Sequence, residues 1–323
     1  MQATMVGTEI IKDAVRLACR APSLYNIQPW RWVLTGNGQL QLFLDRNRVT
    51  VSDRSGREAL IGCGAALDHL RVAMAAAGWQ AHINRFPNPD NANQLASIEF
   101  TPLEQVTDAD RRRADAILLR RTDRLPFNAP LAWEWLEHIR YADAVRVEVL
   151  PDEARSELAN ASQLTESLRL YNSAYHDELR WWTAPFEASE GIPYSSLVSA
   201  SEGDRVGVDR VFPIAHHPER RAEVPEDHAA ILVLATDTDT RADALATGEE
   251  LSAVLLECTM AGLVTCPLTH VTEVRVAREI VKSLLDDDAV PQILVRVGAA
   301  PTTEGVPPPT PRRPLDEVLQ LPA

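Results

Sequence analysis

The sequence predicts an α+β protein made of two similarly organised halves, in which helices flank mixed or antiparallel sheets. Its 323 residues suit two modest domains of roughly 150 residues better than one core. Stretches with apolar residues at helical spacing are interspersed with short strand-like runs. A weak internal repeat also relates Gly64-x-x-Leu67-x-x-Leu70 to Gly248-x-x-Leu251-x-x-Val254, at a constant offset of 184 residues from Gly64 to Gly248. Each copy lies between two predicted strands, which favours a duplication.

The first half is expected to span residues 1–104. Its pattern predicts a helix over 8–20, strands over 29–34 and 40–44, a long helix over 60–77, and strands near 80–86 and 97–100. Gly36-Asn37-Gly38 is typical of a hairpin turn between the first two strands. Gly78 ends the long helix.

The second half is expected to span residues 105–323. Its pattern predicts helices over 108–119, after Pro130, and over 154–182, 241–261 and 274–285, with strands over 145–150, 229–235 and 292–297 and a short strand or loop over 263–268. Residues 184–227 lack periodicity and contain many Gly and Pro, as in a lid or binding loop. Residues 301–323 are rich in proline, which predicts an extended arm outside any core.

Composition excludes several classes of protein. Lys+Arg is 32 and Asp+Glu is 46, so a formal net charge of −14 disfavours nucleic-acid and anionic-membrane partners. The four cysteines include no Cys-x-x-Cys pair, which argues against a zinc site and a disulfide framework. No charged segment followed by an apolar run marks a signal peptide, and no apolar run reaches the ~20 residues of a membrane span. We therefore expect a cytoplasmic protein without a metal.

A first candidate site is the segment Ala21-Pro22-Ser23-Leu24-Tyr25-Asn26-Ile27-Gln28-Pro29-Trp30, between a helix and a strand. Pro22 stops the helix, and Ser23 and Asn26 can bond nearby backbone in a turn. Such a loop presents hydroxyl, amide and backbone N–H groups to a ligand. On composition alone, a helix stop with local capping explains it as well.

A second candidate is Arg120-Arg121-Thr122-Asp123-Arg124. Three guanidinium groups and a hydroxyl can surround a phosphate with charge-assisted hydrogen bonds. The alternative is a solvated helix end, where arginine is favoured by the helix dipole.

Two further segments are weaker candidates. In the run from Ala261 to His270, the backbone after Gly262 can lie against a ring, whereas Cys266 is more often a packing residue than a nucleophile. Arg312 and Arg313 lie on the proline-rich arm, where stiffness would hold them against an anion at low entropic cost. The alternative for them is a disordered tail.

Together these segments resemble the FMN-dependent nitroreductase family. Pro22-Ser23-x-x-Asn26-x-Gln28-Pro29-Trp30 is similar to its most recognisable motif, and Arg120-Arg121-Thr122-x-Arg124-x-x-Phe127 to its Arg-Arg-Ser motif, with Thr122 in place of Ser. The turn Gly262-Leu263-Val264-Thr265 is similar to Gly-Leu-Gly-Thr, and Arg312-Arg313 to a C-terminal basic segment. The unusual motif order is similar to the actinobacterial Acg subgroup, which implies a nitroreductase-like fold with two halves fused into an intramolecular pseudo-dimer.

The resemblance implies a single composite FMN site. Arg120, Thr122 and Arg124, with Arg121, would approach the phosphate and ribityl chain, and Arg312 and Arg313 would join at the phosphate. Pro22, Ser23, Asn26 and Gln28 would close the site from the other half, and the backbone of Cys266, Pro267, Leu268 and Thr269 would lie near the redox edge. No catalytic side chain is expected, because the flavin does the hydride chemistry.

Three functions remain open at this point. The first is an NAD(P)H-dependent reductase of nitro compounds or quinones. The second is an FMN-binding storage or sensor protein whose flavin is covered by residues 184–227. The third, a helical scaffold without a ligand, is disfavoured by the four motifs. A pseudo-dimer completes its own site, so a monomer is expected.

Overall fold

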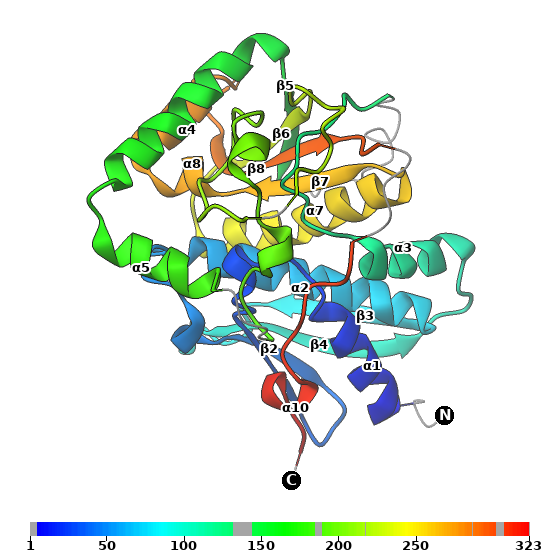
Figure 1. The fold of residues 1–323 in the computed structure, drawn as a ribbon. Coiled ribbons are helices and arrows are strands. Elements are labelled where there is room, and N and C mark those ends of the chain that lie inside the picture. The colour runs from blue at the N-terminus through cyan, green and yellow to red at the C-terminus, as the bar shows by residue number, and fades with distance from the viewer. Residues whose placement is uncertain are drawn as a thin grey trace.

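The computed structural model describes residues 5–131, 144–184, 189–216, 218–285, 287–301 and 307–322. Helices and two β-sheets make an α+β fold (Figure 1). The first sheet has the strand order β3-β4-β2-β1-β9. Its strands are β1 (Trp30–Leu34), β2 (Leu40–Leu44), β3 (Trp79–Arg85), β4 (Gln94–Pro102) and β9 (Leu319–Gln320). The second sheet has the order β5-β6-β8-β7. Its strands are β5 (Arg146–Leu150), β6 (Ala230–Thr236), β7 (Val264–Leu268) and β8 (Val290–Gly298).

Two 20-residue helices, α2 (Arg57–Ala76) and α7 (Arg241–Met260), pack against each other between the two sheets (Figure 1). The other helices are α1 (Thr8–Ala18), α3 (Asp108–Leu119), α4 (Arg155–Arg169), α5 (Ser173–Trp182), α6 (Ala200–Gly203), α8 (His270–Glu273), α9 (Arg275–Lys282) and α10 (Leu315–Val318). Short 3-10 turns include η1 (Leu24–Asn26), η2 (Arg46–Arg48), η4 (Asp152–Ala154) and η5 (Tyr194–Ser196).

The two sheets share one topology. When β9 is set aside, the order β3-β4-β2-β1 corresponds to β7-β8-β6-β5, and all neighbouring strands in both series are antiparallel. In each series a 20-residue helix connects the third strand of that order to the first, α2 from β2 to β3 and α7 from β6 to β7. The repeat at the 184-residue offset therefore corresponds to a repeated strand–helix–strand unit.

The repeated glycines mark the point where α2 and α7 cross. A Cβ atom added to Gly64 would lie 2.0 Å from the carbonyl oxygen of Leu245, and one added to Gly248 would lie 2.0 Å from that of Ile61. Both distances are far below any real Cβ contact. Glycine at both positions thus lets the two backbones touch, and the two halves share one continuous apolar core around this crossing.

The end of the proline-rich arm contradicts the expectation that the tail lies outside any core. Val318 and Leu319 are 1% and 5% exposed and belong to the main core. Strand β9 pairs in parallel with β1, with Leu319 opposite Trp32. Apolar side chains after the last proline allow this strand to form. The arm thus carries the second half of the chain onto the sheet of the first.

The predicted helix over 154–182 is two helices. Helix α4 ends at Arg169, and α5 starts at Ser173, where the Asn172 side chain accepts a hydrogen bond from the Tyr175 backbone N–H. An asparagine in this capping position favours a new helix start over continuation. The helix expected after Pro130 falls largely within 132–143, outside the described residues.

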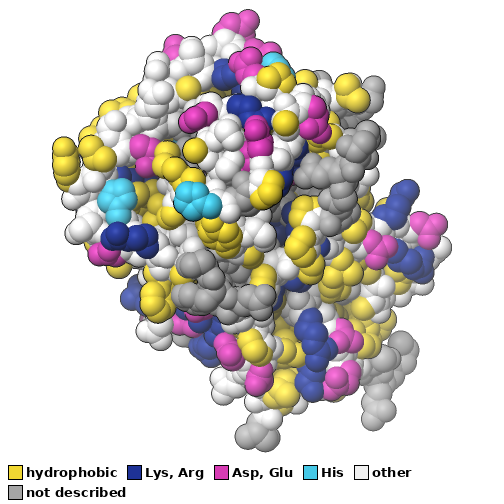
Figure 2. Space-filling model, viewed as in Figure 1, with side chains coloured by type: hydrophobic (Ala, Val, Ile, Leu, Met, Phe, Trp, Pro, Cys, Tyr) yellow, Lys and Arg dark blue, Asp and Glu magenta, His cyan; other side chains and the backbone are white. Residues whose placement is uncertain are grey.

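One helix in the described part of the chain, α2, is long and apolar enough to cross a membrane, but 83% of that window is buried inside the protein. Burial of this extent is what a core helix shows. Acidic and basic side chains are interspersed on the face shown in Figure 2, so the negative net charge does not gather there into a single patch.

Candidate functional site

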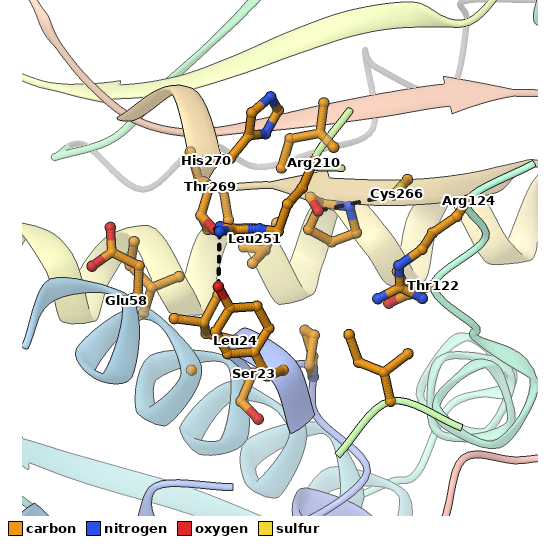
Figure 3. Close-up of a pocket in the computed structure, with 18 of the residues that line it drawn as sticks. Ser23, Leu24, Glu58, Thr122, Arg124, Arg210, Leu251, Cys266, Thr269 and His270 are labelled. Carbon is orange, nitrogen blue, oxygen red and sulfur yellow. Dashed lines mark hydrogen bonds between the residues drawn. The ribbon is translucent and has the colours of Figure 1, made fainter. Parts of the chain in front are cut away.

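A hollow that is open to solvent lies between the two halves, and the space inside it, open solvent included, is about 680 Å³. Its walls come from the turn Pro22–Gln28 (called the Pro-Ser turn below), the start of α2, the segment after α3, and β7 (Figure 3). Eight of the predicted site residues line it: Pro22, Ser23, Thr122, Arg124, Cys266, Pro267, Leu268 and Thr269. Segments separated by more than 200 residues in sequence thus meet in one cavity.

The Pro-Ser turn has an unusual backbone. Tyr25, Asn26 and Gln28 have φ angles of 50°, 60° and 52°, a left-handed region that side chains other than glycine rarely adopt. The Ser23 hydroxyl accepts a hydrogen bond from the Gln28 backbone N–H at 3.0 Å, so local capping does occur here. Such strain persists only where surrounding contacts impose it, and it is common at functional sites.

The side chains of Asn26 and Gln28 make the contacts that hold this backbone in place, and neither of them lines the hollow. The Asn26 amide donates to the carbonyl oxygens of Gly191 at 3.0 Å and Pro311 at 3.2 Å. The fully buried Gln28 amide donates to the Ser189 carbonyl at 2.8 Å and accepts from the Arg313 backbone N–H at 2.9 Å. These two side chains tie the turn to the segment after residue 189 and to the C-terminal arm.

Three arginine side chains from distant segments form a cluster beside the Pro-Ser turn: Arg20, Arg120 and Arg312. Arg120 and Arg312 both donate to the Arg20 carbonyl oxygen, at 3.2 and 3.0 Å, and Arg312 also donates to the Cys19 carbonyl at 2.8 Å. Arg120 is 5% exposed, and its Nε and Nη1 have no partner among the described residues. Burial, with the charge of Arg20, lowers the Arg120 pKa to about 9.

The electrostatics of this arginine cluster favour an anion. Burial and the charges of Arg20 and Arg120 hold the pKa of Arg312 well below its usual value. No salt bridge joins any of the three to a carboxylate in the described part of the chain. Buried like charges without a counter-charge are costly, and an anion would relieve both the repulsion and the unmade hydrogen bonds.

Arg121 and Arg313 have other partners. The Arg121 guanidinium donates to the carbonyl oxygens of Leu118 and Pro307, as at a helix end. The Arg313 guanidinium pairs with Glu317 at 3.3 Å. Arg124 lies over the Phe212 ring at 5.1 Å and lines the hollow. In each pair of neighbouring arginines, the first residue (Arg120 or Arg312) joins the cluster, and the second (Arg121 or Arg313) makes contacts within the fold.

The segment after α3 is held against β7. Thr122 forms an isolated parallel β-bridge with Thr265, and the Asp123 N–H donates to the Thr265 carbonyl oxygen at 2.9 Å. Cys266 is 2% exposed, and burial raises the pKa of its thiol to about 12. A buried thiol with a raised pKa is a poor nucleophile at neutral pH, as expected of a packing residue.

No sequence motif marks the hydrogen-bond network around Arg210. Arg210 lines the hollow beside Thr269 (Figure 3). Its guanidinium donates to the hydroxyl oxygens of Tyr25 at 2.8 Å, Tyr175 at 3.1 Å and Thr269 at 3.1 Å, and it pairs with Glu273. Glu58, at the start of α2, also faces the hollow. Arg210 lies in the stretch without periodicity, so its sequence neighbours gave no signal for this role.

The segment 189–227 (called the lid segment, described except for residue 217) is folded against the Pro-Ser turn. Ile192, Leu197 and Ala215 form an apolar cluster with Tyr25 and Ile27. It contains η5 and the short helix α6, whose capping box joins Ser199 and Glu202.

Three ion pairs anchor the lid segment to the rest of the protein. They are Arg48–Glu190, Arg210–Glu273 and Arg221–Asp123. Arg48 lies in the first half, whereas Asp123 belongs to the arginine motif. Irregular backbone held by long-range side-chain contacts leaves no periodic pattern, which explains why the sequence predicted no structure here.

No family model matches this chain. It is 58% identical, over 99% of its length and 98% of the relative's, to a Mycobacterium tuberculosis protein named "Putative NAD(P)H nitroreductase acg". It is 52% identical to an uncharacterized protein of the same organism, covering 97% of this chain and 93% of that one. A third protein of that organism, with the description "Putative NAD(P)H nitroreductase", is 35% identical over 97% of this chain and 92% of its own length.

Solved structures overlap the chain only in part. The FMN-dependent nitroreductase NfnB from Mycobacterium smegmatis, in complex with NADPH, covers 65% of this chain and 97% of its own at 15% identity and a TM-score of 0.39. A nitroreductase with bound FMN from Desulfitobacterium hafniense covers 63% and 94% at 15% identity and the same TM-score. The assignment therefore depends on the full-length relatives, and through them the chain belongs to the nitroreductase family, in its Acg-like subgroup.

Proposed function

We propose that the chain binds FMN in the hollow, with the phosphate on the arginine cluster and the ring beside β7. The observation that carries this proposal is the pair of unpartnered guanidinium nitrogens on buried Arg120. The three cluster arginines do not line the hollow themselves; they lie at the start of the Pro-Ser turn, where Arg120 and Arg312 bond the Arg20 carbonyl, and Pro22 and Ser23 of that turn line the hollow. An anion with several acceptor oxygens fits this donor set, as a phosphate does. The second observation is that Thr122 and Arg124 face the same hollow.

FMN supplies hydride chemistry when it is bound, and the protein contributes position and hydrogen bonds. Arg120, Arg312 and Arg20 hold the phosphate, and Thr122 and Arg124 lie where the ribityl chain passes. Ser23 closes the hollow from the first half. The backbone of Cys266–Thr269 faces the ring. NAD(P)H is the electron donor and a nitro compound or quinone is the acceptor in this proposal.

The test is FMN affinity in the double variant Arg120→Ala/Thr122→Ala. Each lost charge-assisted contact should cost about 1.5–3 kcal/mol, so affinity should fall at least a hundredfold. Equilibrium dialysis measures it, with circular dichroism as the folding control. Arg112→Ala on the exposed side of α3 is the matched control and should bind FMN normally. Equal affinity in the double variant and in this control would refute the assignment.

The lid segment favours a second candidate, an FMN-binding protein with little turnover. Ile192, Asp209, Arg210 and Phe212 of this segment line the hollow, and three ion pairs anchor it. If it stays closed, NAD(P)H reaches the flavin only in the fraction of open molecules, and the apparent affinity falls by that fraction. The protein would then store FMN or act as a sensor.

Replacing residues 186–222 by a short Gly/Ser linker separates the two candidates. We expect faster reduction of bound flavin by NADPH, measured by stopped-flow absorbance on protein saturated with FMN, because the deletion also removes the Gly191 and Ser189 carbonyls that bond Asn26 and Gln28. Glu190→Gln is the milder variant, because it breaks the ion pair with Arg48 while Arg48 keeps its hydrogen bond to the Ile27 carbonyl at 2.9 Å. Rapid reduction of the intact protein, unchanged in both variants, would favour the open reductase.

A further inference from the structure

A second cavity lies between the halves and is not used by the proposed FMN site. Its empty volume is about 1690 Å³, and it is lined by the segment 51–58, the region where α4 gives way to α5, and the α8–α9 region. Glu58 lines both this cavity and the hollow. Helices α5 and α8 lie on the same side of the molecule in Figure 1. We call this cavity the arginine cleft.

Five arginines line the arginine cleft: Arg54, Arg57, Arg169, Arg275 and Arg278. Two come from the first half and three from the second. Arg169 pairs with Glu273 at 2.8 Å, and Arg278 makes a two-pronged contact with Asp239 at 2.7 and 2.8 Å. The exposed Arg54 and Arg275 make no ion pair or hydrogen bond with any described residue. Four carboxylates also line the cleft (Glu58, Asp239, Glu273 and Glu279), so the exposed Arg54 and Arg275 carry its unpaired positive charge.

Two of these arginines are buried and incompletely bonded. Arg57 is 7% exposed; its Nη2 donates to the Thr272 carbonyl at 2.8 Å and contacts Glu58, while its Nη1 has no partner in the described regions. Arg169 is 8% exposed; its guanidinium lies over the Tyr175 ring at 4.4 Å, and its Nη1 makes no hydrogen bond with any described residue. Buried donors normally find an acceptor, so one nitrogen on each of these arginines is free to donate to a ligand oxygen.

One helix dipole points the same way. Helix α9 starts at this cleft, and its N-cap residue Val274 makes no side-chain cap, whereas the first turn of α2 is already capped by Asp53, whose carboxylate accepts a hydrogen bond from the Ala59 N–H at 2.8 Å. The partial positive charge of a helix N-terminus favours an anion, and phosphate above all. This partial charge adds to the donors of the buried Arg57 and Arg169 and would not by itself indicate a site.

We propose that the arginine cleft binds a small phosphorylated molecule with two phosphate groups, at a site separate from the arginine cluster. Arg54 and Arg57 would hold it from the first half, and Arg169 and Arg275 from the second. A diphosphate offers two anionic groups, and the planar guanidinium fork of arginine matches the oxygens of each. Its binding links the two halves across the cleft.

Titration calorimetry with inorganic pyrophosphate at low salt tests the site. Wild-type protein should bind it, and Arg54→Ala/Arg275→Ala should bind at least tenfold more weakly, because two charge-assisted contacts are lost. These side chains are exposed, so the fold should survive their loss. Arg111→Ala/Arg112→Ala removes the same charge from the exposed face of α3 and should leave the affinity unchanged. No binding to the wild type, or equal affinity in the two double variants, would overturn the proposal.

A second variant separates the cleft from the arginine cluster, which could also take pyrophosphate. Arg120→Met/Arg312→Met removes the cluster's guanidinium groups, and pyrophosphate should still bind in the cleft. Loss of all binding in this variant would assign the ligand to the cluster and sink the cleft proposal. Failure of the wild type to bind FMN, with cleft binding intact, would refute the proposed function alone.

Discussion

Arg120 shows how a residue can be unfavourable for the fold and still be kept for a ligand. Its side chain is almost fully buried beside two other arginines, and burial lowers its pKa to about 9, well below the usual value for arginine. The unfolded chain therefore binds more protons than the folded one from about pH 9 up to the pKa of an unperturbed arginine. The free energy of unfolding must then rise with pH across that window. At pH values below the window, the buried charge lowers the stability of the folded protein by its full cost.

Replacing Arg120 by Met should stabilise the ligand-free protein at pH 7. The buried charge disappears while the apolar stem volume is largely kept, so we expect a gain of about 1–2 kcal/mol in the free energy of unfolding. Urea denaturation followed by circular dichroism measures it. Arg112→Met, on the exposed side of α3, should change stability by about 0.5 kcal/mol or less. A loss of stability in Arg120→Met would mean that the cluster holds the fold together.

The sequence alone located the arginine motif and the arm, but it could not tell which arginine of each neighbouring pair lies in the cluster. Adjacent residues such as Arg120 and Arg121 project in different directions, and which one enters the cluster depends on the path after the helix. Arg121 bonds helix-end carbonyls and Arg120 the Arg20 carbonyl. Arg20 and Arg210 lay outside any motif, because their partners are distant in sequence.

At the scale of elements, the close packing of α2 against α7 depends on the absence of a Cβ atom at the crossing. Gly64→Ala would place a methyl group 2.0 Å from the Leu245 carbonyl oxygen, so the two helices must separate. Separation opens the shared core, and we expect a loss of at least about 1–3 kcal/mol. Thermal unfolding checks it. Gly207→Ala is the control, because its added Cβ would meet only Ala159 at 3.9 Å. Equal melting temperatures of the two variants would show that the helices can separate at the crossing with little loss of stability.

Most strands and helices followed from periodicity, whereas connections did not. The hairpin between β1 and β2 was predicted by Gly36-Asn37-Gly38, and the strands came within a few residues of their bounds. The break between α4 and α5 was missed because apolar spacing continues across it, and one asparagine decides it. The path of the lid segment depends on Arg205, which donates to the carbonyl oxygens of Arg221 and Val224.

At the scale of the whole molecule, the hollow needs both halves. Ser23 and Glu58 face Thr122 and Cys266 across it. Residues 1–104 and 106–323, expressed as separate fragments, should each fail to hold FMN, whereas co-expression should restore binding. Equilibrium dialysis with FMN decides it. Stoichiometric flavin on either fragment, at concentrations where that fragment is monomeric, would contradict a composite site.

The pairing of β9 with β1 sets an order on the synthesis of the protein. Trp32 meets its partner Leu319 only after the second half has been translated. Until then the β1 edge of the nascent sheet stays bare, and an unpaired edge is a template for aggregation. Arg312 arrives on the same arm, so the cluster is also completed late. A ribosome that stalls within the second half would leave a chain with both an open sheet edge and an unfinished anion site, a substrate for chaperones and proteases rather than a half-active protein.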